Sequence, residues 1–285
     1  MTFTRPVRFS TGACVIIIAI LLLYSWKIEP GNLTVTNIEM AVPSLVKSCT
    51  VVFMADLHLP LNARIEQKLF VALGKIRPDL ILIGGDFSSY HTPAAYAIDK
   101  LNLLSRFGKT VMVMGNTDIC RSRQCVYCYL KYPVDRLGSL PAVILRNQVL
   151  DLPAFGIRLV GLDDPVTMLD DTLLLQPARQ PCCNVLLLHS VYKLTDDQKN
   201  RFDLICSGHT HGGQVFFSRP FLHWMDPAID PRYVGGIFHI NKTVLAVTRG
   251  IGQSFLPLRL GVPPEIMVFH LSKSAPPHSP AGGFY

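Results

Sequence analysis

The stretch 51–58, Val-Val-Phe-Met-Ala-Asp-Leu-His, is an apolar run that ends in two polar residues. Consecutive apolar residues rich in β-branched and aromatic types are typical of a strand that is buried on both faces. Because side chains alternate along an extended chain, Asp56 and His58 point to the same side. The stretch therefore predicts a buried strand with two side chains of metal-ligand type at its carboxyl end.

The same combination of an apolar run and a polar residue recurs twice, at equal intervals along the chain. Gly84-Gly85-Asp86 follows the second run, and Gly115-Asn116 follows the third. The segments between the runs have apolar residues at helical spacing. This alternation of strand and helix predicts an α/β sheet. The predicted strands are 51–54, 80–83 and 111–114, and the predicted helices are 61–76 and 94–107.

Six further apolar runs are predicted to be strands, and three histidines follow two of them. His189 follows the run 185–188, and His209 and His211 follow the run 204–206. In α/β sheets, ligands bind outside the carboxyl ends of the strands. A single histidine at a strand end is usually structural, but ligand-type residues at five strand ends indicate a metal site. The set is Asp56, His58, Asp86, Asn116, His189, His209 and His211, and the other runs are 143–145, 157–160, 244–247 and 266–269.

The order of these motifs, D-x-H, G-G-D, G-N, H and G-H-T-H, resembles that of the calcineurin-like metallophosphoesterase superfamily. The stretch 208–215 and the ending formed by 249–252, 256–259 and 263–266 are similar to its small bacterial membrane-associated branch. The resemblance extends from residue 50 to residue 271. It implies an α/β fold of four layers, an α-β-β-α sandwich, with a site for two metals.

The resemblance also implies a role for each ligand-type residue. Asp56, His58 and His211 should bind one metal. Asn116, His189 and His209 should bind the other, and Asp86 should bridge both. A hydroxide that bridges the metals is expected to attack the phosphorus of an anionic phosphoester, so that Asp86, Asn116 and His189 count as catalytic. The mixed nitrogen and oxygen ligands suit two divalent ions of Mn, Fe or Zn without selecting among them, and no residue is identified for substrate binding.

The chain departs from the superfamily at Thr117, where the pattern usually has a histidine that is thought to protonate the leaving oxygen. A threonine hydroxyl is too weakly acidic to replace an imidazolium, and general acid help is worth about 10²–10⁴-fold. The loss is smallest when the leaving group is a weak base. We therefore predict hydrolysis of a phosphodiester or diphosphate bond, with a preference for diphosphates and activated diesters. Arg121, Arg123 and His91 are left open as other proton donors.

Two other functions stay open. The UDP-2,3-diacylglucosamine pyrophosphatases of lipid A synthesis resemble this superfamily, and some of them also lack the histidine. A membrane anchor suits their lipid-linked substrate. From another class, a catalytically weak metal-binding scaffold is favoured by Thr117 alone.

The segment 9–26 contains no charged residue, and as a helix it extends about 27 Å, just enough to span a bilayer. Tyr24 and Trp26 stand at one end, where aromatic rings favour the membrane interface. A cleaved signal peptide is one alternative, but no pair of small residues follows the apolar core. A helix this short could also lie in the membrane interface, with the domain on either side. We therefore predict a retained transmembrane anchor in a bacterial inner membrane. Arg5 and Arg8 weakly favour an outward-facing domain, and the membrane face is left open.

The composition limits the class of protein. The 285 residues are 49% hydrophobic and 16% charged, which excludes a disordered chain, a coiled coil and a fibre. The net charge of +7 suits an anionic substrate or an anionic lipid surface. No run of Lys or Arg and no nucleic-acid motif is present, so a nucleic-acid partner is not expected. The oligomeric state is left open. The predicted organisation is a short N-terminal segment 1–8, the anchor 9–26, a connector 27–49, a metallophosphoesterase domain 50–271 and a disordered tail 272–285.

Weaker signals concern loops near these motifs. Three close cysteines either bind a metal or form disulfides, but their spacing lacks a clear fourth ligand. The apolar loop 215–225 either contacts lipid or packs into the core. Asp163 and Asp164 are interpreted as a structural turn that caps a helix, and Asp118 is predicted to orient the backbone of the metal loop. The cysteines are Cys120, Cys125 and Cys128.

Overall fold

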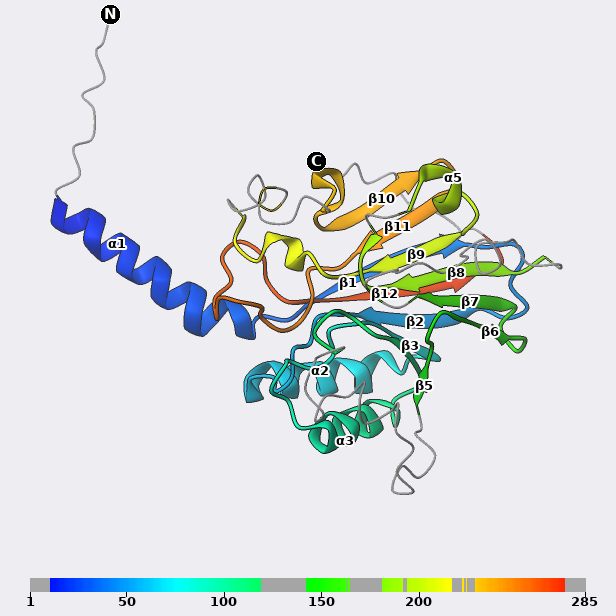
Figure 1. The fold of residues 1–285 in the computed structure, drawn as a ribbon, viewed down its shortest axis with the longest axis horizontal. Helices are drawn as coiled ribbons and strands as arrows, with labels where there is room; N and C mark the ends of the chain where they lie inside the picture. Colours follow the sequence, from blue (N-terminus) through cyan, green and yellow to red (C-terminus); the bar gives the residue numbers. More distant parts are fainter. Residues whose placement is uncertain are drawn as a thin grey trace, which may run out of the picture.

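The computed structural model describes residues 11–118, 142–162, 164, 181–191, 194–216, 222, 224 and 229–274. Within these residues, two six-stranded sheets lie face to face (Figure 1). Helices cover the outer face of one sheet, and a short helix with its flanking loops covers part of the other. The predicted α/β class, with two sheets between helical layers, is confirmed.

The first sheet places the strands of the sequence motifs side by side. It contains β1 (Thr34–Ala41), β12 (Glu265–Ser272), β2 (Cys49–Met54), β3 (Leu80–Gly84), β4 (Lys109–Val113) and β5 (Ala142–Ile144), in that order. β2 to β5 are parallel to one another. β12 is antiparallel to β2, and β1 is parallel to β12. The carboxyl ends of β2, β3 and β4 therefore meet at one edge of the sheet.

The second sheet repeats this arrangement with four parallel strands at its centre. It contains β10 (Gly236–Ile240), β11 (Thr243–Val247), β9 (Leu204–Ser207), β8 (Cys183–Leu188), β7 (Ile157–Leu162) and β6 (Gln148–Leu152), in that order. The two edge strands, β10 and β6, are antiparallel to their neighbours. The carboxyl ends of β7, β8 and β9 share one edge.

The main core lies between the two sheets and consists of large apolar side chains. Phe53 and Phe269 from the first sheet and Leu159 and Leu187 from the second are completely buried in it. Burial of side chains of this size stabilises the fold by about 1.5–3 kcal/mol each. The sheets are therefore held together by the apolar runs that predicted the strands.

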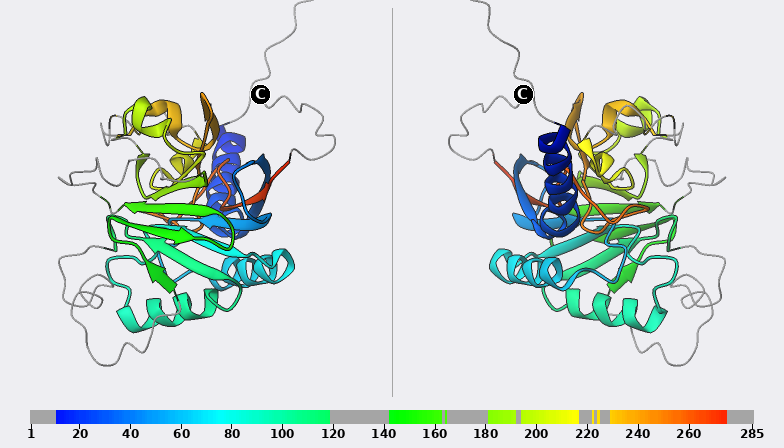
Figure 2. Two further views of the ribbon diagram at one scale, coloured as in Figure 1. Left: turned by 90° about the vertical axis from the view of Figure 1, so that its right-hand side faces the viewer. Right: turned by 90° about the vertical axis from the view of Figure 1, so that its left-hand side faces the viewer.

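Two helices cover the outer face of the first sheet (Figure 2). They are α2 (Ala63–Ile76) and α3 (Ala94–Leu104). α2 buries Ile65, Leu69 and Leu73, at the spacing of one helix face, and its N-terminal amide of Arg64 donates to the side chain of Asn62 at 2.9 Å. On the second sheet, the four-residue α5 (Asp196–Lys199) and the loops beside it form the outer layer of the described residues.

The segment 27–49, expected to be a connector, contributes a strand to the first sheet. β1 alternates between half-buried and exposed residues along its whole length. Such alternation is typical of an edge strand with one face on the protein, and it lacks the apolar run that marks a central strand. The pairing with β12 extends from Thr34 to Ala41, so the sheet begins before residue 50.

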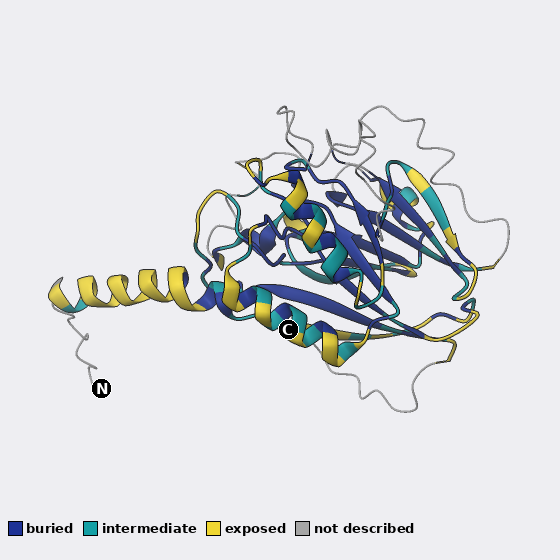
Figure 3. Ribbon diagram, turned by 90° about the horizontal axis from the view of Figure 1, so that it is seen from below, coloured by how far each residue is buried: buried dark blue, intermediate teal, exposed yellow. Residues whose placement is uncertain are grey.

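A long N-terminal helix projects from one end of the sandwich (Figures 1 and 3). α1 (Thr11–Leu23) continues through a π-helical turn, Tyr24–Ile28, into a short 3₁₀ turn, Glu29–Gly31. Among the described residues, the stretch Gly12–Gly31 is the one helix long and apolar enough to cross a membrane. Most of its side chains are exposed, in contrast to the buried strands (Figure 3).

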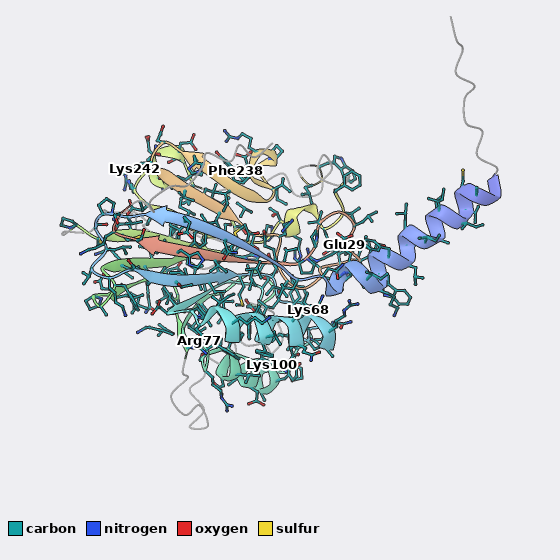
Figure 4. The ribbon with its side chains drawn as sticks, turned by 180° about the vertical axis from the view of Figure 1, so that it is seen from behind. Glu29, Lys68, Arg77, Lys100, Phe238 and Lys242 are labelled. Atoms are coloured by element: carbon teal, nitrogen blue, oxygen red, sulfur yellow. The ribbon has the colours of Figure 1, made fainter. Side chains whose placement is uncertain are left out.

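The base of this helix is bonded to the sandwich. The carboxylate of Glu29 is buried and accepts a hydrogen bond from the amide of Val262 at 2.7 Å. The amide of Arg259 donates to the carbonyl of Ser25 at 2.9 Å, and Nζ of Lys68 on α2 donates to the carbonyl of Gly31 at 2.7 Å. Figure 4 shows Glu29 and Lys68 at this junction. The junction from Ser25 to Gly31 is thus part of the folded domain.

Some predicted features lie outside the described residues. These are the N-terminal segment 1–8, residues 275–285 of the predicted tail, Asp163, and the possible proton donors Arg121 and Arg123. The three cysteines Cys120, Cys125 and Cys128 also lie outside them.

Candidate metal centre

The strand ends bring all seven predicted ligand-type residues together. Asp56 and His58 follow β2, Asp86 follows β3, and Asn116 follows β4. On the second sheet, His189 follows β8, and His209 and His211 follow β9. Two groups of ligand atoms form across the gap between the sheets, and one carboxylate lies between them.

The first group consists of Asp56, His58 and His211. One ligand atom from each residue lies within 4.8 Å of the other two. The Nε2 atoms of His58 and His211 are 3.0 Å apart, and their rings stack with centroids separated by 5.0 Å. Two imidazole nitrogens and a carboxylate oxygen thus face one buried point, which is the donor set of a divalent transition metal.

The second group consists of Asn116, His189 and His209. Nε2 of His189 lies 3.1 Å from Oδ1 of Asn116 and 3.1 Å from Nδ1 of His209. The other ring nitrogen of His189, Nδ1, lies 2.8 Å from the carbonyl of Gly84. This carbonyl fixes the tautomer that leaves Nε2 free to coordinate a metal.

Asp86 lies between the two groups. Its Oδ2 atom is 3.5 Å from Nε2 of His58, and its Oδ1 atom is 3.5 Å from Nε2 of His189. One oxygen therefore faces each group, which is the arrangement that a bridging carboxylate requires.

The backbone at these strand ends adopts conformations that few residues tolerate. Asp56, His58, Asp86, His209 and His211 all have positive φ, between 46° and 73°. For residues other than glycine, such conformations are rare and are concentrated at functional sites. They turn the side chains of consecutive strand ends toward one another.

Close backbone approach also requires glycine at this edge. A Cβ atom at Gly115 would overlap the carboxylate of Asp86, and one at Gly85 would lie 2.7 Å from the amide of Gly115. The glycines of the G-G-D and G-N motifs therefore allow the ends of β3 and β4 to meet.

Burial changes the proton affinity of these groups. Desolvation raises the pKa of Asp86 to about 6, and desolvation with the nearby charge of Asp86 raises the pKa of Asp56 well above its usual value. Desolvation lowers the pKa of His58 to about 3 and also lowers those of His189 and His211. These three imidazoles are thus neutral at physiological pH, the form that binds metals. Buried, mutually repelling carboxylates beside neutral imidazoles fit two divalent cations, which would neutralise the charge.

Asp118 fixes the loops that carry two of these residues. Its Oδ1 accepts from the amide and hydroxyl of Ser88 at 2.9 and 2.8 Å, and its Oδ2 accepts from the amides of Gly115 and Phe87 at 3.0 and 3.2 Å. The carboxylate thereby joins the loop after β3 to the loop after β4. This agrees with its predicted role in orienting the backbone.

Thr117, which stands where the superfamily has its histidine, has its hydroxyl engaged elsewhere. Oγ1 of Thr117 donates to the carbonyl of Ser88 at 2.7 Å, and its amide donates to Oδ1 of Asp86 at 2.8 Å. His91, one alternative proton donor, is exposed on the loop after β3.

Two buried charged residues at the site were not assigned to it from the sequence. Arg259 is completely buried, donates to the carbonyls of Gly252 and Val262, and places Nη2 3.5 Å from Nδ1 of His211. Asp164 lies beside His189, although its sequence suggested only a helix cap. Arg259 lies in the stretch 256–259 that resembles the family, but it follows no strand, so the strand-end rule gave it no role. Asp164 follows β7, and the rule could have included it.

Comparison with known proteins agrees with this geometry. Residues 49–213 match the calcineurin-like phosphoesterase family. The phosphodiesterase YaeI of Escherichia coli K12 is 30% identical over 234 residues, which cover 78% of this chain and 81% of that protein. An uncharacterized metallophosphoesterase of Campylobacter jejuni is 28% identical over 285 residues, covering 95% of this chain and 72% of the relative. A transmembrane protein with a metallophosphoesterase domain from Bos taurus is 29% identical over 258 residues, covering 81% of this chain and 55% of the relative. The resemblance inferred from the strand-end motifs is confirmed: the chain belongs to the calcineurin-like phosphoesterase family and is a metal-dependent phosphoester hydrolase.

Proposed function

We propose that this hydrolase is anchored in a membrane and cleaves phosphodiester or diphosphate bonds with two divalent metal ions. Asp56, His58 and His211 bind one ion, Asn116, His189 and His209 bind the other, and Asp86 bridges them. The observation that carries this assignment is the position of Asp86, with one oxygen 3.5 Å from each group of ligands. When bound, the two ions clamp the phosphate oxygens and acidify a water molecule for attack. The seven ligand residues would fix where the ions lie.

The choice of bond follows from Thr117. Its hydroxyl donates to the carbonyl of Ser88, so its proton is committed within the protein. Thr117 therefore does not donate a proton to the departing oxygen. A leaving group that is a weak base departs without this help. For an alkoxide leaving group, the rate of hydrolysis falls by about 10²–10⁴-fold without a general acid. The E. coli relative is named a phosphodiesterase, which agrees with a diester as the substrate.

Turnover of two model substrates tests the bond preference. With Mn²⁺ present, we expect bis(p-nitrophenyl) phosphate to be hydrolysed faster than a simple alkyl phosphomonoester. Thr117→Val keeps the shape of the side chain but removes the hydroxyl, and it should leave the ratio of the two rates unchanged. Faster hydrolysis of the monoester, or a selective loss of alkyl ester turnover in Thr117→Val, would contradict the proposal.

The metal assignment needs a separate measurement. Wild-type protein is expected to bind two metal ions per chain, and Asp86→Asn should lower both metal content and turnover. Asp151→Asn is the matched control, because Asp151 is exposed on β6 and belongs to neither group of ligands. Two bound metals without turnover of any phosphoester would indicate a metal-binding scaffold instead of an enzyme.

The membrane anchor is supported by the exposed surface of α1. The helix projects away from the sandwich, and most of its residues are exposed (Figure 3). Exposed apolar surface of this extent is expected to be covered by lipid in the native setting. At the base of the helix, Tyr24 and Trp26 are exposed, and Nζ of Lys27 lies 3.5 Å from the centroid of the Trp26 ring. Aromatic and basic residues are typical of the interface between lipid tails and water.

A lipid-linked diphosphate is a second candidate substrate, favoured by apolar side chains near this junction. Phe255 is 94% exposed, and Leu256 and Phe216 are also exposed. These residues belong to loops that bond to each other, through the amide of Phe216 and the carbonyl of Leu260 at 2.9 Å. UDP-2,3-diacylglucosamine is therefore included in the substrate panel together with cyclic nucleotides and phospholipids.

Fractionation of cells tests the anchor. The full-length protein is expected to stay in the membrane fraction after alkaline carbonate extraction, with an intact N-terminus by mass spectrometry. A shortened N-terminus would show that the helix is a cleaved signal peptide. A reporter fused to the C-terminus then identifies the membrane face.

A further inference from the structure

Asp164 lies at the end of β7, in the same relation to its strand as the proposed metal ligands. β7 is the parallel neighbour of β8, with Leu162 paired to Leu188, so Asp164 follows β7 beside the point where His189 follows β8. The amide of Asp164 donates to the carbonyl of Met114 at 3.1 Å. This bond crosses between the sheets and brings Asp164 to the loop that carries Asn116.

The side chain of Asp164 faces the second group of ligands. A carboxylate oxygen of Asp164 and one ring nitrogen each of His189 and His209 lie within 4.8 Å of one another. Three donors of two chemical types thus converge from the ends of β7, β8 and β9. This distance is compatible with a single ion between them, since metal–ligand bonds to oxygen and nitrogen are about 2.0–2.2 Å long.

The carboxylate is buried, yet one of its oxygens is unsatisfied. Asp164 is 3% exposed, and its Oδ1 atom has no hydrogen-bond partner among the described residues. A buried carboxylate oxygen without a partner is costly, so such atoms are normally hydrogen-bonded or coordinate a metal.

The difference in charge between the two groups of ligands also favours Asp164 as a metal ligand. The first group has a carboxylate of its own, Asp56, whereas Asn116 in the second group contributes only a neutral amide. With Asp86 shared, the second cation would have less than one full negative charge among its assigned ligands. Asp164 would give each cation one carboxylate of its own.

We propose that Asp164 is an additional ligand of the second metal ion, beside Asn116, His189 and His209. This inference rests on the proposed two-metal site. With Asp164, the second site has more negative charge than its other ligands provide. A carboxylate oxygen favours a hard or borderline divalent ion such as Mn²⁺ or Fe²⁺ more than imidazole ligands alone would.

Metal analysis of three variants tests this role. Asp164→Asn keeps the volume but removes the charge, and it should lower the affinity for the second Mn²⁺ ion by more than the roughly 10–100-fold typical of outer-shell changes. The content should fall from two ions toward one, and the electron paramagnetic resonance signal of a coupled Mn²⁺ pair should be lost. His209→Ala is the positive reference, and Asp151→Asn is the negative control. Each variant is first shown to be folded by circular dichroism.

The outcomes separate this inference from the proposed function. If His209→Ala loses a metal but Asp164→Asn retains both with unchanged affinity, Asp164 is not a ligand and the two-metal site stands. If neither variant changes the metal content, the two-metal site itself is wrong. A crystal structure of the wild-type protein grown with Mn²⁺ gives a second test that needs no variant. A carboxylate oxygen of Asp164 at about 2.0–2.3 Å from the second ion supports the inference, and a separation beyond about 3.5 Å overturns it.

Discussion

Asp118 joins the loops after β3 and β4, and replacing it by asparagine is expected to destabilise the protein measurably. Each carboxylate oxygen accepts two hydrogen bonds: Oδ1 from the amide and hydroxyl of Ser88, and Oδ2 from the amides of Phe87 and Gly115. An asparagine side chain has only one oxygen. In either orientation its NH₂ group faces two of these four donors.

The cost can be estimated from the donors that lose their acceptor. Leaving one buried donor unsatisfied costs about 1–3 kcal/mol, so two donors cost about 2–6 kcal/mol. A domain is typically stable by only about 5–15 kcal/mol, so Asp118→Asn should remain folded but lose a large part of its stability. Burial raises the pKa of Asp118 to about 6. The measurement is therefore made near pH 7.5, where the carboxylate is ionised in the wild type.

Urea unfolding of the metal-free protein, with chelator present, gives the free energy directly. Asp79→Asn is the matched control, because Asp79 accepts from one backbone amide, that of Thr50 at 2.9 Å, at the opposite end of β2 and β3. We expect its loss to stay below about 1 kcal/mol. If Asp118→Asn is no less stable than Asp79→Asn, the view that this carboxylate fixes the site is refuted. Metal affinity should also fall in Asp118→Asn by about 10–100-fold.

Three more predictions concern the glycines, the pH dependence and the anchor. Gly115→Ala should abolish metal binding, as measured by metal analysis, because the new Cβ overlaps the carboxylate of Asp86. At Gly74 in α2, the nearest atom to a new Cβ lies at 3.8 Å, so Gly74→Ala should stabilise the protein by about 0.5–1 kcal/mol, as measured by calorimetry. Because the pKa of Asp86 is raised to about 6, protons compete with metal below that value, so calorimetric metal affinity should fall as pH is lowered through 6; a constant affinity would contradict this. Glu29→Ala removes the acceptor of the Val262 amide and should cost about 1–3 kcal/mol, with faster hydrogen exchange of that amide; unchanged exchange would show that the bond contributes nothing.

The central strands were predictable from the sequence, as was the edge strand β5, which the run 143–145 marked, but the other three edge strands were not. β2, β3, β8 and β9 are buried on both faces, so each appears as an apolar run. β1, β6 and β10 lie at sheet edges, and most of their residues are half-buried or exposed. Their sequences alternate or mix polar and apolar residues, which short windows do not distinguish from loops.

The positions of the proposed ligands were predictable for a related reason. Parallel strands present their carboxyl ends at one edge, so residues that directly follow buried runs are brought together whatever their separation in sequence. Arg259 escaped this rule, because a loop residue that contacts the carbonyls of other loops has no periodic pattern. The left-handed backbone at residues such as Asp56 and His209 could not be predicted from the sequence either, since it depends on contacts formed only in the folded chain.

The bonded base of the N-terminal helix has a mechanical consequence. Ser25, Glu29 and Gly31 are each hydrogen-bonded to the sandwich, so the base of the helix is held rigidly against it. If α1 crosses a bilayer as proposed, the tilt of the helix sets how the metal site is oriented and how far it lies from the membrane. This tilt responds to bilayer thickness. The loop from Arg259 to Val262 connects the base of the helix to the metal site, since Nη2 of Arg259 lies 3.5 Å from Nδ1 of His211, so a change in helix tilt would be transmitted to that site.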